Sequence, residues 1–374
     1  MNDKKKVTFV FQKARKDRLN KNIPFAKDMF YTYFSFSEVA ETELIEFGDV
    51  PPGRRYKYLW KFENSIRSAL KIPMYSLYLT NKRNFQKFAI SDHVILGTNR
   101  VATSCFPMML AIKLLNKKVK FTFFVLGLYA SRPKYFILRG IQSVFYFLLF
   151  SLTDNIIFIG QGEYKHAIKK SRFHKRKFSY LPFGIDVNFW KTERTPSFEK
   201  KKEILFVGND SSRDFELVKQ IAKQMPNYKF IFVTSGIEKE DTGDNVTLYS
   251  GTWGDPVLSD LELKSIYEQS KLTIVPMKET VQPSGQSVAL QSMIIGTPVL
   301  ISNISGLWDK EKLVNGENIY LMDTNNVEDW VNKIKHLYKN ENELISVSKK
   351  SIETVIDSFS ISIFYENVKK TINF

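Results

Sequence analysis

The sequence predicts an α/β protein made of two doubly wound domains that face each other across a cleft. Its 374 residues suit two domains of ordinary size. Short apolar runs alternate with amphipathic stretches in both halves, as in strand–helix–strand units. Residues 184–202 form a polar, proline-containing connector between the two series. In such domains the ligand lies at the carboxyl ends of the strands.

In the first half, apolar runs predict strands and helical periodicity predicts the segments between them. The expected strands are 7–12, one within 37–46, 93–98, 120–129, 155–160 and 178–183. The expected helices are 58–71, 107–118, 134–152 and 164–170. Pro73 agrees with a helix end just before it.

A second alternation follows the connector. Its expected strands are 203–208, 229–236, 245–251, 272–276 and 298–302. Its expected helices are 214–225, 259–270, 288–295, 327–338, 341–357 and 359–372. We therefore expect a first domain at 1–183, a linker at 184–202 and a second domain at 203–358, with 359–374 packing back near the first domain.

Cysteine and histidine usage argues against a disulfide framework and against a metal site. Cys105 is the single cysteine, and the four histidines are scattered along the chain. The apolar part of the N-terminus is too short for a signal peptide. The longest apolar candidate, Val144 to Leu152, is about half of a membrane span. We expect a cytoplasmic protein that is soluble or peripheral to a membrane.

Charge is divided unevenly between the halves. Residues 1–180 hold 33 Lys+Arg and 12 Asp+Glu, a net of +21, and the remainder carries −5. Basic and aromatic residues alternate from Arg132 to Phe147, which suits an anionic membrane surface. Nucleic acid would be attracted by the same charge, although no nucleic-acid module is visible. The alternative is a solvated basic face together with a buried aromatic helix.

The turn after the expected strand 203–208 reads Gly208, Asn209, Asp210, Ser211, Ser212, Arg213. A glycine at a strand end, small polar residues and an arginine at a helix start suit a diphosphate. Arginine is permanently charged and donates paired hydrogen bonds to phosphate oxygens. The alternative is a polar loop in which Arg213 pairs with Asp210 or Asp214.

The segment from Pro283 to Val299 predicts a turn, a buried helix ended by Gly296, and a new strand. Ser284 is the expected N-cap, and Gly285 allows close approach to the backbone. The N–H groups of Gly285, Gln286 and Ser287 would face an anion. Gln291, among apolar neighbours, would find partners in a ribose, unless it lies on the solvent side.

Glu279 is the only carboxylate between Lys271 and Leu290. A carboxylate at the rim of a cleft can bind sugar hydroxyls or stabilise an oxocarbenium-like centre. The alternative is a solvent-exposed pair with Lys278.

Five motifs of the second half resemble, in the same order, the donor domain of GT-B glycosyltransferases of the retaining family 4, or group 1, type. The resemblance covers 181–340. Its motifs are LPFGIDVNFW (181–190), ILFVGND with Arg213, LKSIYEQSKLTIVP (263–276), SGQSVALQSMIIGTPVLIS (284–302) and GLWDKEKLVNGENIYLM (306–322). The resemblance implies two Rossmann-like domains and a nucleotide-sugar site. The implied donor-binding residues are Gly208, Asn209, Asp210, Arg213, Ser284, Gly285, Gln286, Ser287 and Gln291.

The family pattern has two glutamates eight positions apart in the donor segment, where this chain has Pro283 and Gln291. Glu279 and Gln282 are therefore the candidate catalytic residues. The glycine-rich loop that the family has after its first strand is also absent, and KARKDRLNKN follows instead. Arg15, Asp17 and Arg18 in that segment are the candidates for the acceptor side.

The resemblance implies a metal-independent hexosyltransferase that uses a UDP- or GDP-sugar as co-substrate and needs no cofactor. The acceptor would be a hydroxyl of a lipid-linked or other saccharide in bacterial surface polysaccharide synthesis, with retention at the anomeric carbon. The protein would be peripheral on the inner face of the cell membrane and would not bind nucleic acid. The alternative is a catalytically inactive GT-B-like protein that binds a nucleotide sugar or a membrane.

Overall fold

The computed structural model describes residues 4–21, 23–48, 56–115, 117–193, 197–199 and 201–374. These fall into two compact units. The first unit contains Met1–Lys21, Phe30–Leu181 and Tyr365–Phe374, and the second contains Asn22–Met29 and Pro182–Phe364. The second unit therefore includes a short segment from near the N-terminus, as well as all the described residues of the expected linker 184–202.

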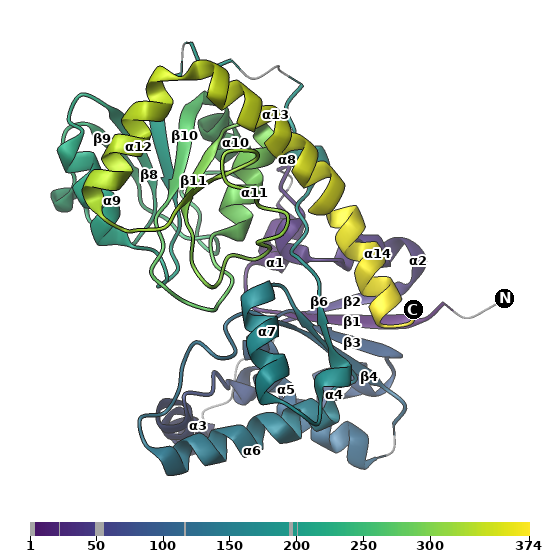
Figure 1. The fold of residues 1–374 in the computed structure, drawn as a ribbon. Coiled ribbons are helices and arrows are strands. Elements are labelled where there is room, and N and C mark those ends of the chain that lie inside the picture. The colour runs from purple at the N-terminus through teal and green to yellow at the C-terminus, as the bar shows by residue number, and fades with distance from the viewer. Residues whose placement is uncertain (1–3, 22, 49–55, 116, 194–196, 200) are drawn as a thin grey trace. The chain divides into compact units, whose positions relative to one another are not determined.

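The first unit has a six-stranded parallel sheet of order β2-β1-β3-β4-β5-β6. The strands are β1 (Lys6–Phe11), β2 (Glu41–Glu46), β3 (His93–Leu96), β4 (Lys120–Val125), β5 (Asn155–Phe158) and β6 (Phe178–Tyr180). The flanking helices are α1 (Arg15–Asn20), α2 (Tyr33–Val39), α3 (Lys57–Leu70), α4 (Lys82–Ala89), α5 (Asn99–Leu114), α6 (Phe136–Leu152) and α7 (Gln161–Lys170) (Figure 1).

The second unit repeats this plan with the order β12-β11-β10-β7-β8-β9, again all parallel. Its strands are β7 (Glu203–Val207), β8 (Lys229–Val233), β9 (Val246–Tyr249), β10 (Ser270–Val275), β11 (Val299–Ser302) and β12 (Tyr320–Met322). Its helices are α8 (Val187–Trp190), α9 (Phe215–Gln224), α10 (Asp260–Gln269), α11 (Gln286–Ile295), α12 (Val327–Lys339) and α13 (Glu341–Ser358). The predicted doubly wound α/β class is confirmed.

The last helix, α14 (Ile361–Thr371), begins in the second unit and ends in the first. Within the first unit, the ring of Phe374 meets that of Phe36 edge-on, with centroids 4.9 Å apart. Tyr365 contacts the same Phe36 ring at 5.1 Å. The terminal residues therefore pack on α2 through aromatic contacts.

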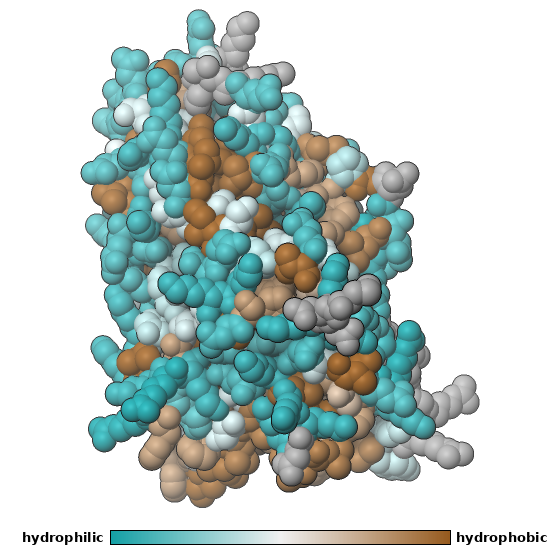
Figure 2. Space-filling model, turned by 90° about the vertical axis from the view of Figure 1, so that its right-hand side faces the viewer, coloured by the Kyte–Doolittle hydropathy of each residue, from teal (hydrophilic) through white to brown (hydrophobic). Residues whose placement is uncertain are grey.

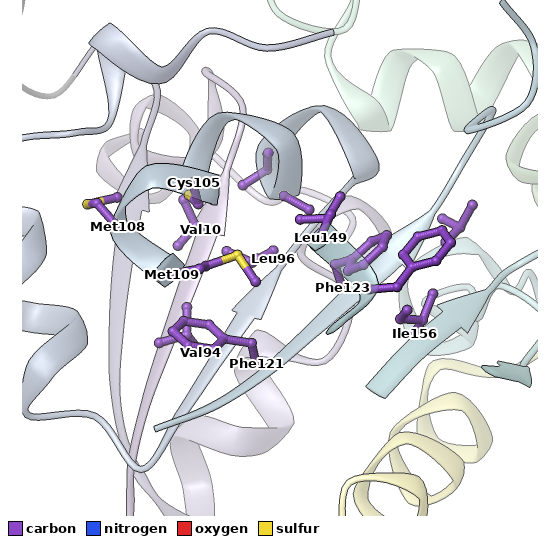
Figure 3. Packing of buried hydrophobic residues seen from close by; sticks show 14 of the residues in the cluster. Val10, Val94, Leu96, Cys105, Met108, Met109, Phe121, Phe123, Leu149 and Ile156 are labelled. Carbon is purple, nitrogen blue, oxygen red and sulfur yellow. The ribbon is translucent and has the colours of Figure 1, made fainter. Parts of the chain in front are cut away.

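The central strands are unbroken apolar runs in the sequence because both faces of a parallel sheet are covered and buried. In the first unit, β1, β3 and β4 bury Val10, Val94 and Phe121 against α5, which supplies Cys105 and Met109 (Figure 3). Burial raises the pKa of the Cys105 thiol, so this cysteine is an apolar core residue.

One expected helix boundary is wrong. Residues 107–118 were predicted as a helix, but α5 begins eight residues earlier, where Thr98 accepts the N–H of Val101. Pro107 lies inside α5. The first half of α5 is buried on most sides, so it lacks the amphipathic period from which a helix is predicted. None of the helices in the described ranges has both the length and the apolar composition that crossing a bilayer requires.

Gly140 in α6 gives a test of local helix stability. An added methyl group there would meet no heavy atom within 4 Å. Glycine in a helix interior costs about 0.5–1 kcal/mol relative to alanine, so Gly140→Ala is expected to raise the free energy of unfolding by about that amount in urea denaturation followed by circular dichroism. Gly316→Ala is the matched control, because its site is equally open but its φ is +78°, and it should destabilise. A loss of stability in Gly140→Ala would contradict the prediction.

Candidate functional site

The turn after β7 is organised around the side chain of Arg213. Its guanidinium is 3% exposed, its Nε lies 3.3 Å from Asp210 Oδ2, and its Nη1 donates to the thioether sulfur of Met277 at 2.8 Å. Burial lowers the pKa of Arg213, while Asp210 opposes that shift. Of the two partners considered from the sequence, Asp210 forms the ion pair.

Two glycines make room for this guanidinium. A Cβ on Gly208 would lie 2.1 Å from Arg213 Nε, and one on Gly285 would lie 2.8 Å from Arg213 Nη1. Gly285 also has φ +75°, a left-handed conformation that favours glycine. Arg213 therefore lies directly against the backbone at the start of α11.

Asp210 and Asn209 hold the surrounding turns in place. Asp210 Oδ1 accepts the Ser284 hydroxyl at 2.7 Å and the Ser212 N–H at 3.1 Å. Asn209 donates to the Gly251 carbonyl at 2.8 Å and accepts the Ser235 N–H at 2.6 Å. These two predicted donor-binding residues thus connect the loops that follow β7, β8 and β9 and the turn before α11.

The predicted N-cap at Ser284 is wrong. Gly285 is the N-cap of α11 and no side chain caps the helix, because the Ser284 hydroxyl is turned toward Asp210. The helix end at Gly296 is confirmed, with φ +88°. No described residue provides an acceptor for the N–H groups of Gly285, Gln286 and Ser287. They remain available to an anion, favoured by the helix dipole.

Gln286, the first residue of α11, is buried, and its Oε1 has no hydrogen-bond partner among the described residues. An unpaired buried amide oxygen is costly and uncommon. It lies at the same helix end as the open N–H groups, which marks this end as a place where a ligand would supply the missing partner.

Gln291 is 8% exposed, so the interpretation that it lies on the solvent side is wrong. Its Oε1 accepts the Tyr267 hydroxyl at 3.3 Å, and its Nε2 donates to Asp28 Oδ2 at 3.1 Å. The protein itself satisfies this amide, and Gln291 connects α11 to α10 and to the short segment 23–29.

Asp28 is a site residue that the sequence alone did not reveal. It is 1% exposed and accepts three hydrogen bonds, from the Asp186 N–H (2.5 Å), the Trp190 indole (2.7 Å) and Gln291. Burial raises its pKa to about 7, although all three donors oppose that shift. Asp28 begins a single 3-10 turn, Asp28–Phe30, directly after Lys27, and an acidic residue in so short an element gives no local signal of such a position.

The two candidate catalytic residues lie on the loop between β10 and α11. Glu279 is exposed, and its carboxylate accepts the Ser305 N–H at 3.2 Å. Gln282 is half-buried, and its N–H donates to the Thr280 hydroxyl at 3.1 Å. A Cβ on Gly306 would lie 2.2 Å from the Gln282 carbonyl oxygen, so the turn 305–306 fixes the path of this loop.

The three candidates for the acceptor side belong to the first unit. Arg15 is buried, donates to the carbonyls of Gln12 and Lys13, and lies 5.2 Å from the Phe11 ring centroid. Its backbone N–H donates to Glu46 at 2.5 Å. Asp17 is exposed and Arg18 half-buried on the short helix α1. Ala14, which caps that helix, has φ +83° in the loop that lacks glycine.

Residues 201–340 match the family model "Glycosyl transferases group 1". No curated protein matches the chain in sequence. Similar solved structures include a glycosyltransferase from Rickettsia africae, with a TM-score of 0.66, 12% identity and coverage of 100% of this chain and 99% of that one. A sucrose-phosphate synthase from Thermosynechococcus elongatus has a TM-score of 0.68, 12% identity and coverage of 99% and 98%.

Anabaena HepE in complex with UDP-glucose has a TM-score of 0.63 and 10% identity, with coverage of 98% of this chain and 99% of that one. Identities this low bear on the fold alone. The predicted GT-B fold and the resemblance to group 1 glycosyltransferases are confirmed.

Proposed function

We propose that the protein, whose residues 201–340 match the model of group 1 glycosyltransferases, moves a hexosyl group from a UDP- or GDP-sugar to a hydroxyl of a saccharide acceptor. The observation that carries this proposal is the position of Arg213. A buried, permanent cation lies against Gly285, beside the open N–H groups of α11. A diphosphate is a far better hydrogen-bond acceptor for Arg213 than the thioether of Met277, and it would also accept the open N–H groups of α11.

In this proposal the second unit stabilises the departing diphosphate by fixed positive charge. Arg213 and the N–H groups of 285–287 are already oriented, so little reorganisation is needed as negative charge develops. Gln286 Oε1, unpaired within the described chain, would accept a hydroxyl of the donor. Glu279 or Gln282 would face the anomeric carbon, with retention of configuration as in family 4, and no metal ion would be required.

The proposed acceptor is lipid-linked and belongs to bacterial surface polysaccharide synthesis, with the protein peripheral on the inner face of the membrane. The net charge of +21 over residues 1–180 supports attraction to anionic lipids. Arg15, Asp17 and Arg18 remain the candidates for acceptor recognition, with the buried Arg15 acting through the loop that it holds together.

A thermal-shift panel of UDP-, GDP-, ADP- and CMP-sugars tests the donor site. A UDP- or GDP-sugar is expected to raise the unfolding temperature by several degrees, since saturation to about 100 times Kd adds about 2.7 kcal/mol. Turnover with that donor should persist in EDTA, and NMR of the product should show a retained anomeric configuration. Absence of stabilisation by every nucleotide sugar would contradict the proposal, whereas binding without turnover on any acceptor would favour an inactive GT-B-like protein.

A further inference from the structure

Helix α6 exposes a long apolar face. It buries Tyr146, Leu149 and Phe150 against the first sheet, yet Phe136 is 81% exposed at its start. Exposed apolar side chains continue along the helix at Ile137, Ile141, Val144, Phe147 and Leu148. Four of these, at 137, 141, 144 and 148, recur at the spacing of one helix face. The apolar composition of α6 thus exceeds what packing on the sheet explains.

Helix α3 extends this apolar surface. Tyr58 is 82% exposed, and Leu59, Trp60 and Phe62 are also exposed. The Gln142 amide of α6 donates to the carbonyl of Leu70 at the end of α3 at 2.9 Å, which holds the two helices together. Figure 2 shows hydrophobic side chains gathered at the lower end, where Figure 1 places α3 and α6. Exposed apolar patches of this kind mark interaction surfaces.

The neighbouring segment carries an excess of positive charge. Residues 126–177 contain ten Lys+Arg and two carboxylates. Both carboxylates are engaged: Asp154 pairs with Lys113 at 3.2 Å, and the buried Glu163 accepts the N–H groups of Gly127 and Tyr129 at 3.0 and 3.2 Å. The cations at the surface therefore lack a counter-charge from their own segment.

A cavity of about 430 Å³ opens between α6, the loop 128–132 and residues 170–174. Arg132, Arg139, Lys170 and Arg172 line it, and no Asp or Glu is among its described lining residues. Arg139 is held in place because it donates to the carbonyls of Pro133 and Lys134. Phe147 and Phe173 meet edge-on at the cavity, with centroids 6.0 Å apart.

We propose that this cavity binds the phosphate of an anionic membrane phospholipid while the exposed apolar side chains of α6 and α3 enter the bilayer interface. The inference deepens the membrane part of the proposed function and rests on it. The described residues that line the cavity include cations but no carboxylate, which favours an anionic headgroup, and adjacent aromatic and aliphatic side chains gain free energy on leaving water.

The aliphatic side chains along the exposed face of α6 favour lipid over nucleic acid. Single-stranded nucleic acid stacks its bases on aromatic rings and contacts cations. Ile137, Ile141 and Val144 offer no stacking surface, but they enter the apolar region beneath lipid headgroups.

Vesicle co-sedimentation of the full chain tests the proposal, with phosphatidylglycerol-containing and pure phosphatidylcholine vesicles. The wild type should bind the anionic vesicles at least tenfold more tightly and lose this preference in high salt. Lys170→Ser with Arg172→Ser should weaken binding roughly thirty-fold, at about one kcal/mol per cation. Phe136→Ser with Ile137→Ser should weaken it by a similar factor.

Two control pairs match these changes on the second unit. Lys335→Ser with Lys349→Ser removes the same charge, and Val257→Ser with Leu261→Ser removes exposed apolar side chains. Both pairs should bind vesicles like the wild type. Equal loss in test and control pairs, no preference for anionic vesicles, or tighter binding to single-stranded RNA than to vesicles would overturn the proposal.

Nucleotide-sugar stabilisation, measured on the same variants without vesicles, separates this inference from the proposed function. It should be unchanged in the Lys170/Arg172 and Phe136/Ile137 pairs. If donor binding persists but vesicle binding is absent, the membrane surface alone is wrong. If vesicles bind but no nucleotide sugar does, the proposed function fails and the membrane surface stands.

Discussion

Arg213→Ala is expected to lower affinity for the nucleotide sugar by about a hundredfold or more. The substitution removes the buried cation against which the diphosphate would lie, and hydrogen bonds to charged groups contribute about 1.5–3 kcal/mol each. Asp210 keeps the hydrogen bonds from Ser284 and Ser212, so the turn should remain folded. Titration calorimetry with the donor found in the panel measures the loss, and circular dichroism checks the fold.

Gly208→Ala tests the same geometry without deleting the charge. Its new Cβ would lie 2.1 Å from Arg213 Nε and 2.9 Å from Cζ, so the guanidinium must move. A displacement of this size should cost about tenfold or more in affinity. Lys223→Ala on the exposed surface of α9 is the matched control for the charge that Arg213→Ala removes, and it should bind the nucleotide sugar as the wild type does. A folded Arg213→Ala variant with unchanged affinity would show that the diphosphate does not lie at this turn.

The elements of the fold that could be predicted are those with a local sequence pattern. Buried parallel strands such as β4 and β10 appear as continuous apolar runs because both of their faces are covered. The end of α11 was predictable because Gly296 takes a left-handed conformation that other residues rarely adopt. Short helices such as α1 and α8 carry too few turns for a periodic signal, and the sequence did not predict them.

The candidate site was predictable only where its residues are neighbours in sequence. The turn at 208–213 and the start of α11 could be assigned to the same strand edge because parallel strands end together. The contact between Asp28 and Gln291 joins residues 263 positions apart, and nothing local to either residue indicates it. Ser284 follows the rule for an N-cap, yet a competing acceptor, Asp210, takes its hydroxyl.

Asp28→Ala is expected to destabilise the second unit by about 2–5 kcal/mol near pH 5. The substitution leaves three buried donors without their acceptor: the Asp186 N–H, the Trp190 indole and the Gln291 amide. Tryptophan fluorescence, followed in urea, reports mainly on this unit, because four of the five tryptophans, Trp190 among them, belong to it. Asp244→Ala removes an exposed carboxylate from the same unit and should change stability by less than about 0.5 kcal/mol.

The difference in unfolding free energy between the wild type and Asp28→Ala should depend on pH, and this dependence identifies the Asp28 carboxyl as its source. Because burial raises the folded-state pKa of Asp28 to about 7, above the ordinary value of 3.8 for this side chain, the folded protein holds this proton more tightly than the unfolded chain. The resulting stability is fully present below about pH 4 and is lost as pH rises through about 7. The gap in unfolding free energy between wild type and Asp28→Ala should therefore narrow from about pH 5 to about pH 8, by an amount on the order of a few kcal/mol.

Comparing the wild type with Asp28→Ala separates the titration of Asp28 from that of other groups that titrate between about pH 5 and pH 8. Burial also raises the pKa of Glu163 in the first unit to about 7, so the wild-type profile alone contains both contributions. Glu163 is unchanged in Asp28→Ala, and its contribution cancels in the difference. A gap that stays constant or widens with pH would mean that Asp28 is already ionised in the folded protein at low pH, held by its three donors. In that case the three hydrogen bonds would outweigh the cost of burying the carboxylate, and Gln291 would be tied to a permanent negative charge beneath the start of α11.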